Sequence, residues 1–160
     1  MIVAVGCDHA GIEVKAAVAA ELQAAGAEVR DFSLANAAAD DYPDVADEVA
    51  RAVASGTADY GVLVCGTGIG MSITANKVGG VRAALCWNPF TARMSREHND
   101  ANVLCLGGRT TTPEAARAIV QEWIAAAPST EERHVRRRAH VSAIERRGQG
   151  ERDRGQDLSS

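Results

Sequence analysis

A glycine-rich turn that begins with a cysteine is the part of this sequence that most directly suggests chemistry. Residues 59–77 read DYGVLVCGTGIGMSITANK: an apolar run ends at Cys65, glycines alternate with other residues, and a helical pattern follows. Such glycines allow a sharp turn and leave backbone N–H groups uncovered, so the turn can hold an anion. A thiol beside these partial positive charges is available as a base or nucleophile. The turn therefore predicts an anion site with Cys65 built into it.

Other anion-binding loops with a similar composition do not fit. A dinucleotide-binding turn reads G-x-G-x-x-G, but the glycines here are Gly66, Gly68 and Gly70, and Met71 stands where the last one should fall. A Walker loop needs Gly-Lys-Ser/Thr, which is absent, and a cysteine phosphatase loop needs arginine where this chain has Met71. The remaining interpretation is proton abstraction beside a carbonyl, with N–H groups stabilising an enediolate oxygen.

Further polar residues follow the ends of other apolar runs. Asp8 and His9 come after the first run, His98 and Asn99 after the segment that follows the fourth, and Arg109 after the fifth. We expect these side chains to converge with Cys65 at one edge of a sheet. Neither histidine has a partner at the spacing of a helical metal pair, so no metal site and no cofactor are expected.

The elements that must position these residues are short apolar runs alternating with longer helical patterns. The runs predict strands at 2–6, 27–32, 60–64, 82–86 and 103–106, and the patterns between and after them predict helices at 12–25, 45–54, 70–77, 89–97 and 113–126. Asn88-Pro89 and Thr112-Pro113 are typical helix starts. The alternation predicts an α/β fold: a Rossmann-like three-layer sandwich with a five-stranded parallel sheet, whose ligands bind beyond the carboxyl ends of the strands.

The C-terminal part has a different composition. Residues 130–147 predict a helix rich in arginine, with Val135, Val141 and Ile144 as a sparse apolar side. This side is too small to hold the helix on one domain, so the helix is expected to dock across a homodimer. The sequence predicts one domain over 1–147 and a polar, disordered tail over 148–160.

Composition excludes several classes of protein. The 160 residues suit one domain, carry a net charge of −4 and include only 4% aromatic residues, which argues against nucleic-acid binding. The sequence contains no run of about 18 apolar residues, so it predicts no membrane helix. Its first residues resemble a strand rather than a signal peptide, so a cytoplasmic location is expected. The cysteines, at 7, 65, 86 and 105, are too far apart for a zinc ribbon.

These motifs together resemble ribose-5-phosphate isomerase type B, of the ribose/galactose-phosphate isomerase superfamily. The resemblance spans about residues 1–147 in matching order. It rests on GCDHAG at 6–11, DYPD at 41–44, CGTGIG at 65–70, ANK at 75–77, REHND at 96–100, GGR at 107–109 and the C-terminal Arg133-His134-x-x-Arg137.

The resemblance implies a homodimer, with possible pairing into tetramers, in which both chains build each active site. It also implies the interconversion of ribose 5-phosphate and ribulose 5-phosphate without metal or cofactor. In such an enzyme Cys65 is the base that moves a proton between C1 and C2, and Thr67 assists at the oxygens. His98, with Asp8 nearby, opens the sugar ring, and Asn99 binds sugar oxygens. The remaining substrate-binding positions are the anion hole of Gly66, Gly68, Ile69 and Gly70, and the phosphate region of His9, Arg109, Arg133 and Arg137.

Two alternatives remain open. Isomerases of galactose 6-phosphate, allose 6-phosphate and tetrulose phosphates share the superfamily, and the galactose and tetrulose members tend to lose the histidine of the His-Asn pair. This chain keeps His98 and Asn99, which favours the pentose. A non-catalytic sugar-phosphate-binding protein or a thiol-dependent transferase is the other class. On the last helix, Arg133 and Arg137 lie four residues apart and could hold a phosphate, whereas Arg136 and Arg138 are expected to form a solvated face.

Overall fold

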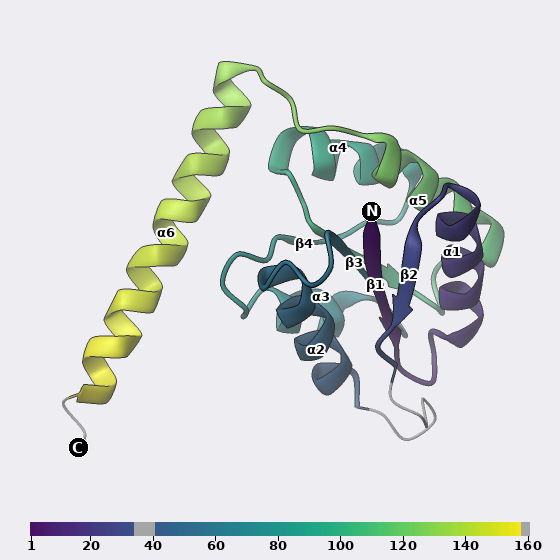
Figure 1. The fold of residues 1–160 in the computed structure, drawn as a ribbon, viewed down its shortest axis with the longest axis horizontal. Coiled ribbons are helices and arrows are strands. Elements are labelled where there is room, and N and C mark those ends of the chain that lie inside the picture. Colours follow the sequence, from purple (N-terminus) through teal and green to yellow (C-terminus); the bar gives the residue numbers. More distant parts are fainter. Residues whose placement is uncertain (34–40, 158–160) are drawn as a thin grey trace.

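A five-stranded, all-parallel sheet forms the centre of the molecule. The computed structural model describes residues 1–33 and 41–157, with side chains up to residue 150. The strands are β1 (Ile2–Cys7), β2 (Glu28–Asp31), β3 (Tyr60–Cys65), β4 (Ala83–Leu85) and β5 (Val103–Gly107). They lie in the order β2-β1-β3-β5-β4 (Figure 1). The predicted parallel sheet is therefore confirmed.

Helices cover both faces of the sheet, as a three-layer sandwich requires. One face carries α1 (Ile12–Ala24), α4 (Pro89–Asn99) and α5 (Pro113–Ala125), and the other carries α2 (Tyr42–Ala54) and α3 (Ile69–Ala75) (Figure 1). Successive residues of a strand point to opposite faces. Val62 accordingly packs in the core on the α1 side, and the next residue, Leu63, packs on the α2 side. Two buried faces explain why the strands lack polar alternation.

The path of the chain leaves a crevice at the carboxyl end of the sheet. From β1 the chain crosses to the edge strand β2, and from β3 it passes over β5 to the opposite edge strand β4. The loops after β1 and β3 thus leave the sheet in opposite directions, and ligands of open α/β sheets bind at such points. Predicted helix starts are also confirmed: the side chain of Asn88 accepts a hydrogen bond from the Thr91 N–H, and that of Thr112 from the Ala115 N–H.

The last helix, α6 (Glu132–Asp157), lies beside the body rather than within its layers (Figure 1). It is joined to α4 near its start, where the Arg138 guanidinium donates to the carbonyl oxygens of Ser129 at 2.8 Å and Glu97 at 3.4 Å. The predicted solvated role of Arg138 is therefore wrong. The helix also continues ten residues past the predicted end at 147, so the expected disordered tail is helical through Asp157, and 158–160 lie outside the described residues.

Along the described part of the chain, no helix combines the length and the apolar character needed to cross a bilayer.

Candidate active site

Cys65 ends β3 and is covered by the turn that follows it. Its side chain is buried, with 4% of the residue exposed, and the Gly68 N–H donates to Cys65 Sγ at 3.2 Å. Next in the turn, the Ile69 N–H lies 3.4 Å from the Thr67 hydroxyl oxygen. The turn therefore directs one backbone N–H at the Cys65 sulfur and holds the Thr67 hydroxyl in the same loop.

Gly68 makes this geometry possible. Its φ of +76° lies in the left-handed region, and a side chain there would begin 2.9 Å from the carbonyl group of Leu106 in β5. Only glycine combines this backbone conformation with so close an approach. The alternation of glycines in the sequence therefore reflects a turn that is pressed against the neighbouring strand.

Arg109 belongs to the same edge through its backbone and its side chain. The Gly108 N–H donates to the Cys65 carbonyl at 2.7 Å, and the Arg109 N–H donates to the Gly66 carbonyl at 2.9 Å. The Arg109 guanidinium lies over Gly66, with Nη1 3.2 Å from the point where a side chain on that glycine would begin. The loop after β5 thus fixes the cysteine turn and brings a positive charge to it.

The loop after β1 completes this edge with Asp8 and His9. Asp8 is 7% exposed, its N–H donates to the Val64 carbonyl at 3.2 Å, and its Oδ1 accepts from the Ala10 N–H at 2.9 Å. His9 is exposed. Of the site residues predicted from the sequence, the carboxyl edge therefore gathers Asp8, His9, Cys65, Gly66, Thr67, Gly68, Ile69, Gly70 and Arg109.

His98 and Asn99 do not join that edge, and the prediction that all these groups converge within one chain is wrong. They end α4, which starts at the carboxyl end of β4 and runs back against the strand direction. Asn102, just beyond them, accepts a hydrogen bond from the N–H of Gly61 at the start of β3. Six strand residues span about 20 Å, so His98 lies roughly that far from Cys65 of the same chain.

The His98 ring is stacked on the ring of His134, a residue to which sequence reasoning gave no role. The ring centroids are 4.1 Å apart and the planes differ by 10°. His134 belongs to α6 and is 4% exposed. Burial, together with the neighbouring charges of His98 and Arg133, lowers the pKa of His134 below its usual value. The sequence signal for His134 is its place between Arg133 and Arg137 in the C-terminal motif.

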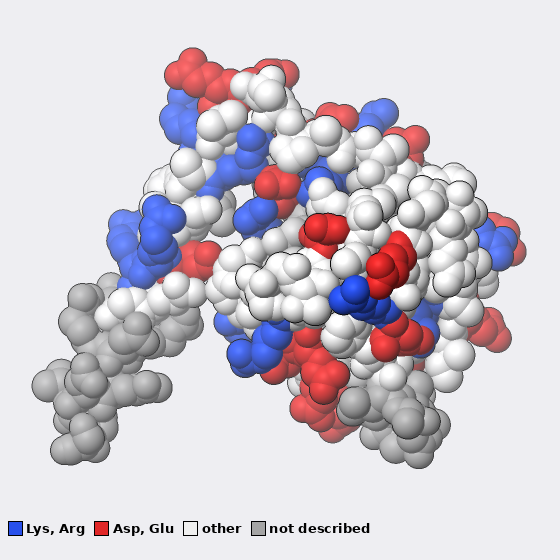
Figure 2. All heavy atoms as spheres, in the orientation of Figure 1, with Lys and Arg blue, Asp and Glu red and all other residues white. Residues whose placement is uncertain are grey.

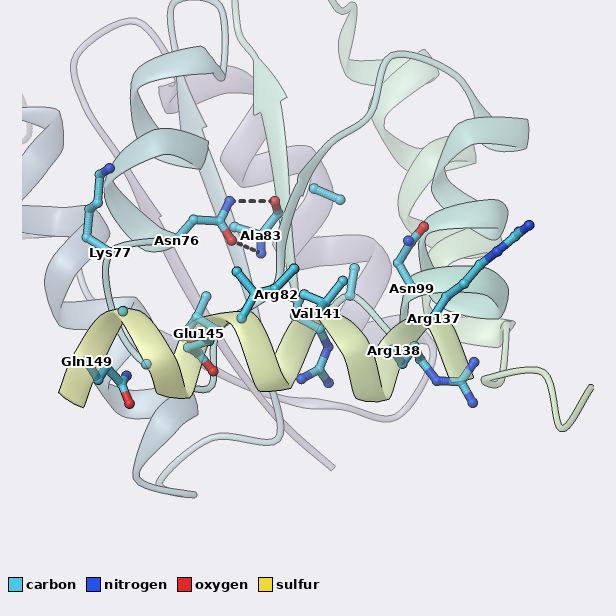
Figure 3. Close-up of a pocket in the computed structure, with 16 residues that line it drawn as sticks. Asn76, Lys77, Arg82, Ala83, Asn99, Arg137, Arg138, Val141, Glu145 and Gln149 are labelled. Carbon is cyan, nitrogen blue, oxygen red and sulfur yellow. Dashed lines mark hydrogen bonds between the residues drawn. The ribbon is translucent and has the colours of Figure 1, made fainter. Parts of the chain in front are cut away.

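Asn99 and Arg137 meet in a cavity of about 550 Å³ between α6 and the β4 edge of the body. Figure 3 shows Asn99, Arg137 and Arg138 toward one end of it, and Lys77 and Gln149 toward the other. Lys and Arg side chains line α6 and the hollow beside it (Figure 2). Arg133 lies outside this cavity lining, is exposed and pairs with Glu131 at 2.8 Å.

Known proteins match this arrangement over most of its length. The sequence profile of the ribose/galactose isomerase family matches residues 3–141. Ribose-5-phosphate isomerase B of Escherichia coli is 45% identical over 145 residues, covering 91% of this chain and 97% of that protein. D-erythrulose-4-phosphate isomerase of Pectobacterium atrosepticum is 42% identical over 123 residues, covering 76% and 81%. The structure of type B ribose 5-phosphate isomerase from Trypanosoma brucei superimposes with a TM-score of 0.86 at 47% identity, covering 90% and 98%.

The chain belongs to the ribose/galactose isomerase family. The resemblance inferred from the motifs is thus confirmed, and the protein is an isomerase by family. Within the described residues, no group of three or more His, Cys, Asp or Glu side chains is placed to hold a metal ion.

The cysteines of this isomerase differ in their surroundings. Burial raises the pKa of the Cys7, Cys86 and Cys105 thiols, and Cys105, in the middle of β5, is fully enclosed. Cys65 differs from them because it accepts a backbone N–H hydrogen bond within a glycine turn. The fold therefore sets one cysteine apart from three that fill the core.

Proposed function

We propose that this protein interconverts ribose 5-phosphate and ribulose 5-phosphate through an enediolate, with Cys65 as the base. The observation that supports this most is the 3.2 Å hydrogen bond from the Gly68 N–H to Cys65 Sγ, inside a turn of further N–H groups. The same turn that holds the sulfur can stabilise an oxygen on which negative charge develops. A carbon acid beside a carbonyl needs both functions at one place.

The proposed steps balance without an oxidant or reductant. The Cys65 thiolate takes the proton from C2 of the open-chain aldose, and the electron pair moves through the carbonyl to form the enediolate. The Thr67 hydroxyl passes a proton between O1 and O2, while the N–H groups from Gly66 to Gly70 stabilise the charged oxygen. Return of the proton to C1 gives the ketose and regenerates the thiolate. No step requires a metal or cofactor.

Ring opening is assigned to His98, and it has to come from a second chain. Ribose 5-phosphate is mainly cyclic, so an acid–base group must open the ring before C2 can lose its proton. Within one chain His98 lies about 20 Å from Cys65, at the other end of β3. A homodimer that sets the amino edge of one copy against the carboxyl edge of the other would complete two equal sites. Asp8 would then act with His98 of the partner subunit.

Exposed apolar side chains on α6 support this assembly. Val135, Val141 and Ile144 are 46%, 52% and 53% exposed in the single chain, and Val141 and Ile144 line the cavity beside the body. On α3, Ile69 and Ile73 are exposed as well. Exposed apolar groups in such numbers are typical of an interface. In the dimer, Asn99 would bind sugar oxygens, and Arg133 and Arg137 would join His9 and Arg109 around the phosphate.

The pentose is proposed as the main substrate because His98 and Asn99 are both present. The 42% identity to a D-erythrulose-4-phosphate isomerase makes a tetrulose phosphate the second candidate. The two substrates differ in one carbon and therefore in the distance between the phosphate and the carbon that loses its proton. For its location, the cytoplasm remains the expectation from the sequence.

The test is turnover of ribose 5-phosphate by purified protein in excess chelator, beside Cys65→Ala and the control Cys86→Ala. We expect native turnover, a loss of about 10²- to 10⁴-fold with Cys65→Ala, and little change with Cys86→Ala. Turnover that survives Cys65→Ala would overturn the assignment of Cys65 as the base. Native protein that converts a tetrulose or hexose phosphate but not ribose 5-phosphate would overturn the substrate.

A further inference from the structure

His134 contacts the residue assigned to ring opening and has no role of its own in the proposed reaction. Its ring lies parallel to that of His98 at 4.1 Å, and it is 4% exposed although the residues on either side of it are exposed. A buried polar ring on a largely exposed helix needs a reason, because burial of a polar group costs free energy. The ring of His98 covers one of its flat faces.

The geometry restricts how the His98 ring can move. His98 is near the end of α4, where the chain turns through Asp100 at φ +50°. Its side chain is half-buried, and its carbonyl lies 3.5 Å from the Arg138 guanidinium of α6. Arg138 therefore fixes the backbone of His98, and the flat face of His134 limits rotation of the ring. One turn of α6 thus contacts both the ring and the backbone carbonyl of His98.

We infer that His134 is a positioning residue for His98, holding its imidazole in the orientation that sugar-ring opening requires. This inference rests on the proposed function. It makes α6 part of the catalytic apparatus beyond any arginines that reach the phosphate.

Chemistry offers a way to separate ring opening from isomerisation. Ribose 5-phosphate closes into a furanose through its C4 hydroxyl, whereas ribulose 5-phosphate cannot, because its C5 oxygen carries the phosphate. Exchange of the C1 proton of ribulose 5-phosphate with solvent deuterium therefore requires the enediolate step and no ring opening. A residue that acts only through His98 should leave this exchange intact.

The experiment measures both reactions for the native protein, His134→Ala, His134→Phe and the control His140→Ala. His140 is an exposed histidine on the same helix. For His134→Ala we expect a fall of about tenfold or more in kcat for ribose 5-phosphate. Its deuterium uptake into ribulose 5-phosphate should stay within about twofold of native. His134→Phe keeps a flat ring and should recover most of the lost ribose turnover, and His140→Ala should match the native protein in both reactions.

Three outcomes would overturn the inference. Ribose turnover by His134→Ala at the native rate would show that the stack has no effect on the reaction. Equal losses of turnover and of deuterium uptake would show that His134 supports the fold or the assembly. Equal impairment of the Ala and Phe variants would show that stacking is not what matters. Failure of the native protein to convert ribose 5-phosphate would instead overturn the proposed function, so the two can fail separately.

Discussion

The two ends of the sheet hold their functional groups by different means. At the carboxyl edge, Cys65, Thr67 and Asp8 are held by hydrogen bonds from backbone N–H groups, some within the glycine turn and some between this segment and neighbouring loops. At the amino edge, His98 is fixed by side chains that arrive from α6, far along the sequence. Backbone hydrogen bonds do not depend on which side chains the loops carry, whereas side-chain contacts depend on the residue itself and on distant elements being in place. The end assigned to proton abstraction is therefore held by its own loops, and the end assigned to ring opening depends on α6.

Side chains also hold the last turn of α4. Arg96 is 4% exposed; its guanidinium donates to Asp100, to the Ala101 carbonyl and to the Tyr60 hydroxyl, and it lies 4.6 Å from the centre of the Tyr60 ring. Asp100 forms a second ion pair, with Arg82, at 3.0 Å. This network fixes the turn from α4 into β5 and thereby the backbone of His98 and Asn99.

The largest expected effect tests whether each active site combines the carboxyl edge of one chain with the amino edge of its partner. Chains carrying Cys65→Ala and His98→Ala should each lose ribose turnover. Co-refolded in equal amounts, they should recover about a quarter of native activity, because half of the dimers are mixed and each mixed dimer has one intact site. The measurement is turnover of the mixture against each variant alone.

The control pairs Cys65→Ala with a chain carrying both substitutions, and this mixture should stay at background because no intact site can form. Recovery in the control would point to contaminating native protein. If the first mixture also stays at background while the native protein is active and dimeric, then the two edges do not serve one site.

The next prediction tests the rigidity of the carboxyl edge. Gly68→Ala should lower kcat by about 10²-fold or more, since the new methyl group meets the Leu106 carbonyl at 2.9 Å and would shift the turn that holds Cys65. Gly56→Ala is the matched control, because Gly56 has nearly the same φ, +77° against +76°, with nothing within 4 Å.

Both alanine variants share the strain of a left-handed residue, about 1–2 kcal/mol. They should therefore lose similar stability from this source and differ in activity, which steady-state kinetics and thermal unfolding together measure. Equal activity of the two variants would mean that the close packing of the turn on β5 is not what places the sulfur.

Sequence reasoning succeeded where signals are local. Apolar runs, the Asn88 and Thr112 caps and the glycine turn each lie within a few residues of what they specify, and the structure has all of them. It failed for His98 because α4 runs back against the strands, so the end of this helix lies at the amino edge of the sheet and not at the carboxyl edge. Spacing along the chain does not carry that information. It also missed His134, whose contact depends on the path of the chain between α5 and α6.

The length of α6 differs from the predicted length for a related reason. Glycines at 148 and 150 lower helix propensity by about 1 kcal/mol each, and a polar composition is typical of disordered tails. The helix nevertheless runs on past them, and Glu145, Gly148 and Gln149 line the cavity beside the body, where the Gly80 N–H donates to Glu145 Oε1 at 3.0 Å. Contacts with residues far away in the sequence thus oppose the local signals.

The smallest effect concerns the side chains that hold the amino edge. Arg96→Met removes the donors to Tyr60, Asp100 and Ala101 while keeping an apolar stem of similar length, so the free energy of unfolding should fall by about 2 kcal/mol. Arg93→Met makes the same change one turn earlier on α4, at an exposed arginine whose nearest carboxylate oxygens are 3.9 and 4.0 Å away. It should cost at most about 0.5 kcal/mol, because such surface pairs contribute little.

Urea unfolding measures the free energy of unfolding of both variants. The protein concentration is kept fixed, since assembly would otherwise shift the midpoints. Equal midpoints would mean that the buried guanidinium does not hold this edge. A lower midpoint for Arg96→Met would show that it does. If that variant also converts ribose 5-phosphate more slowly but takes up deuterium into ribulose 5-phosphate at the native rate, the stability of the α4 turn is tied to ring opening.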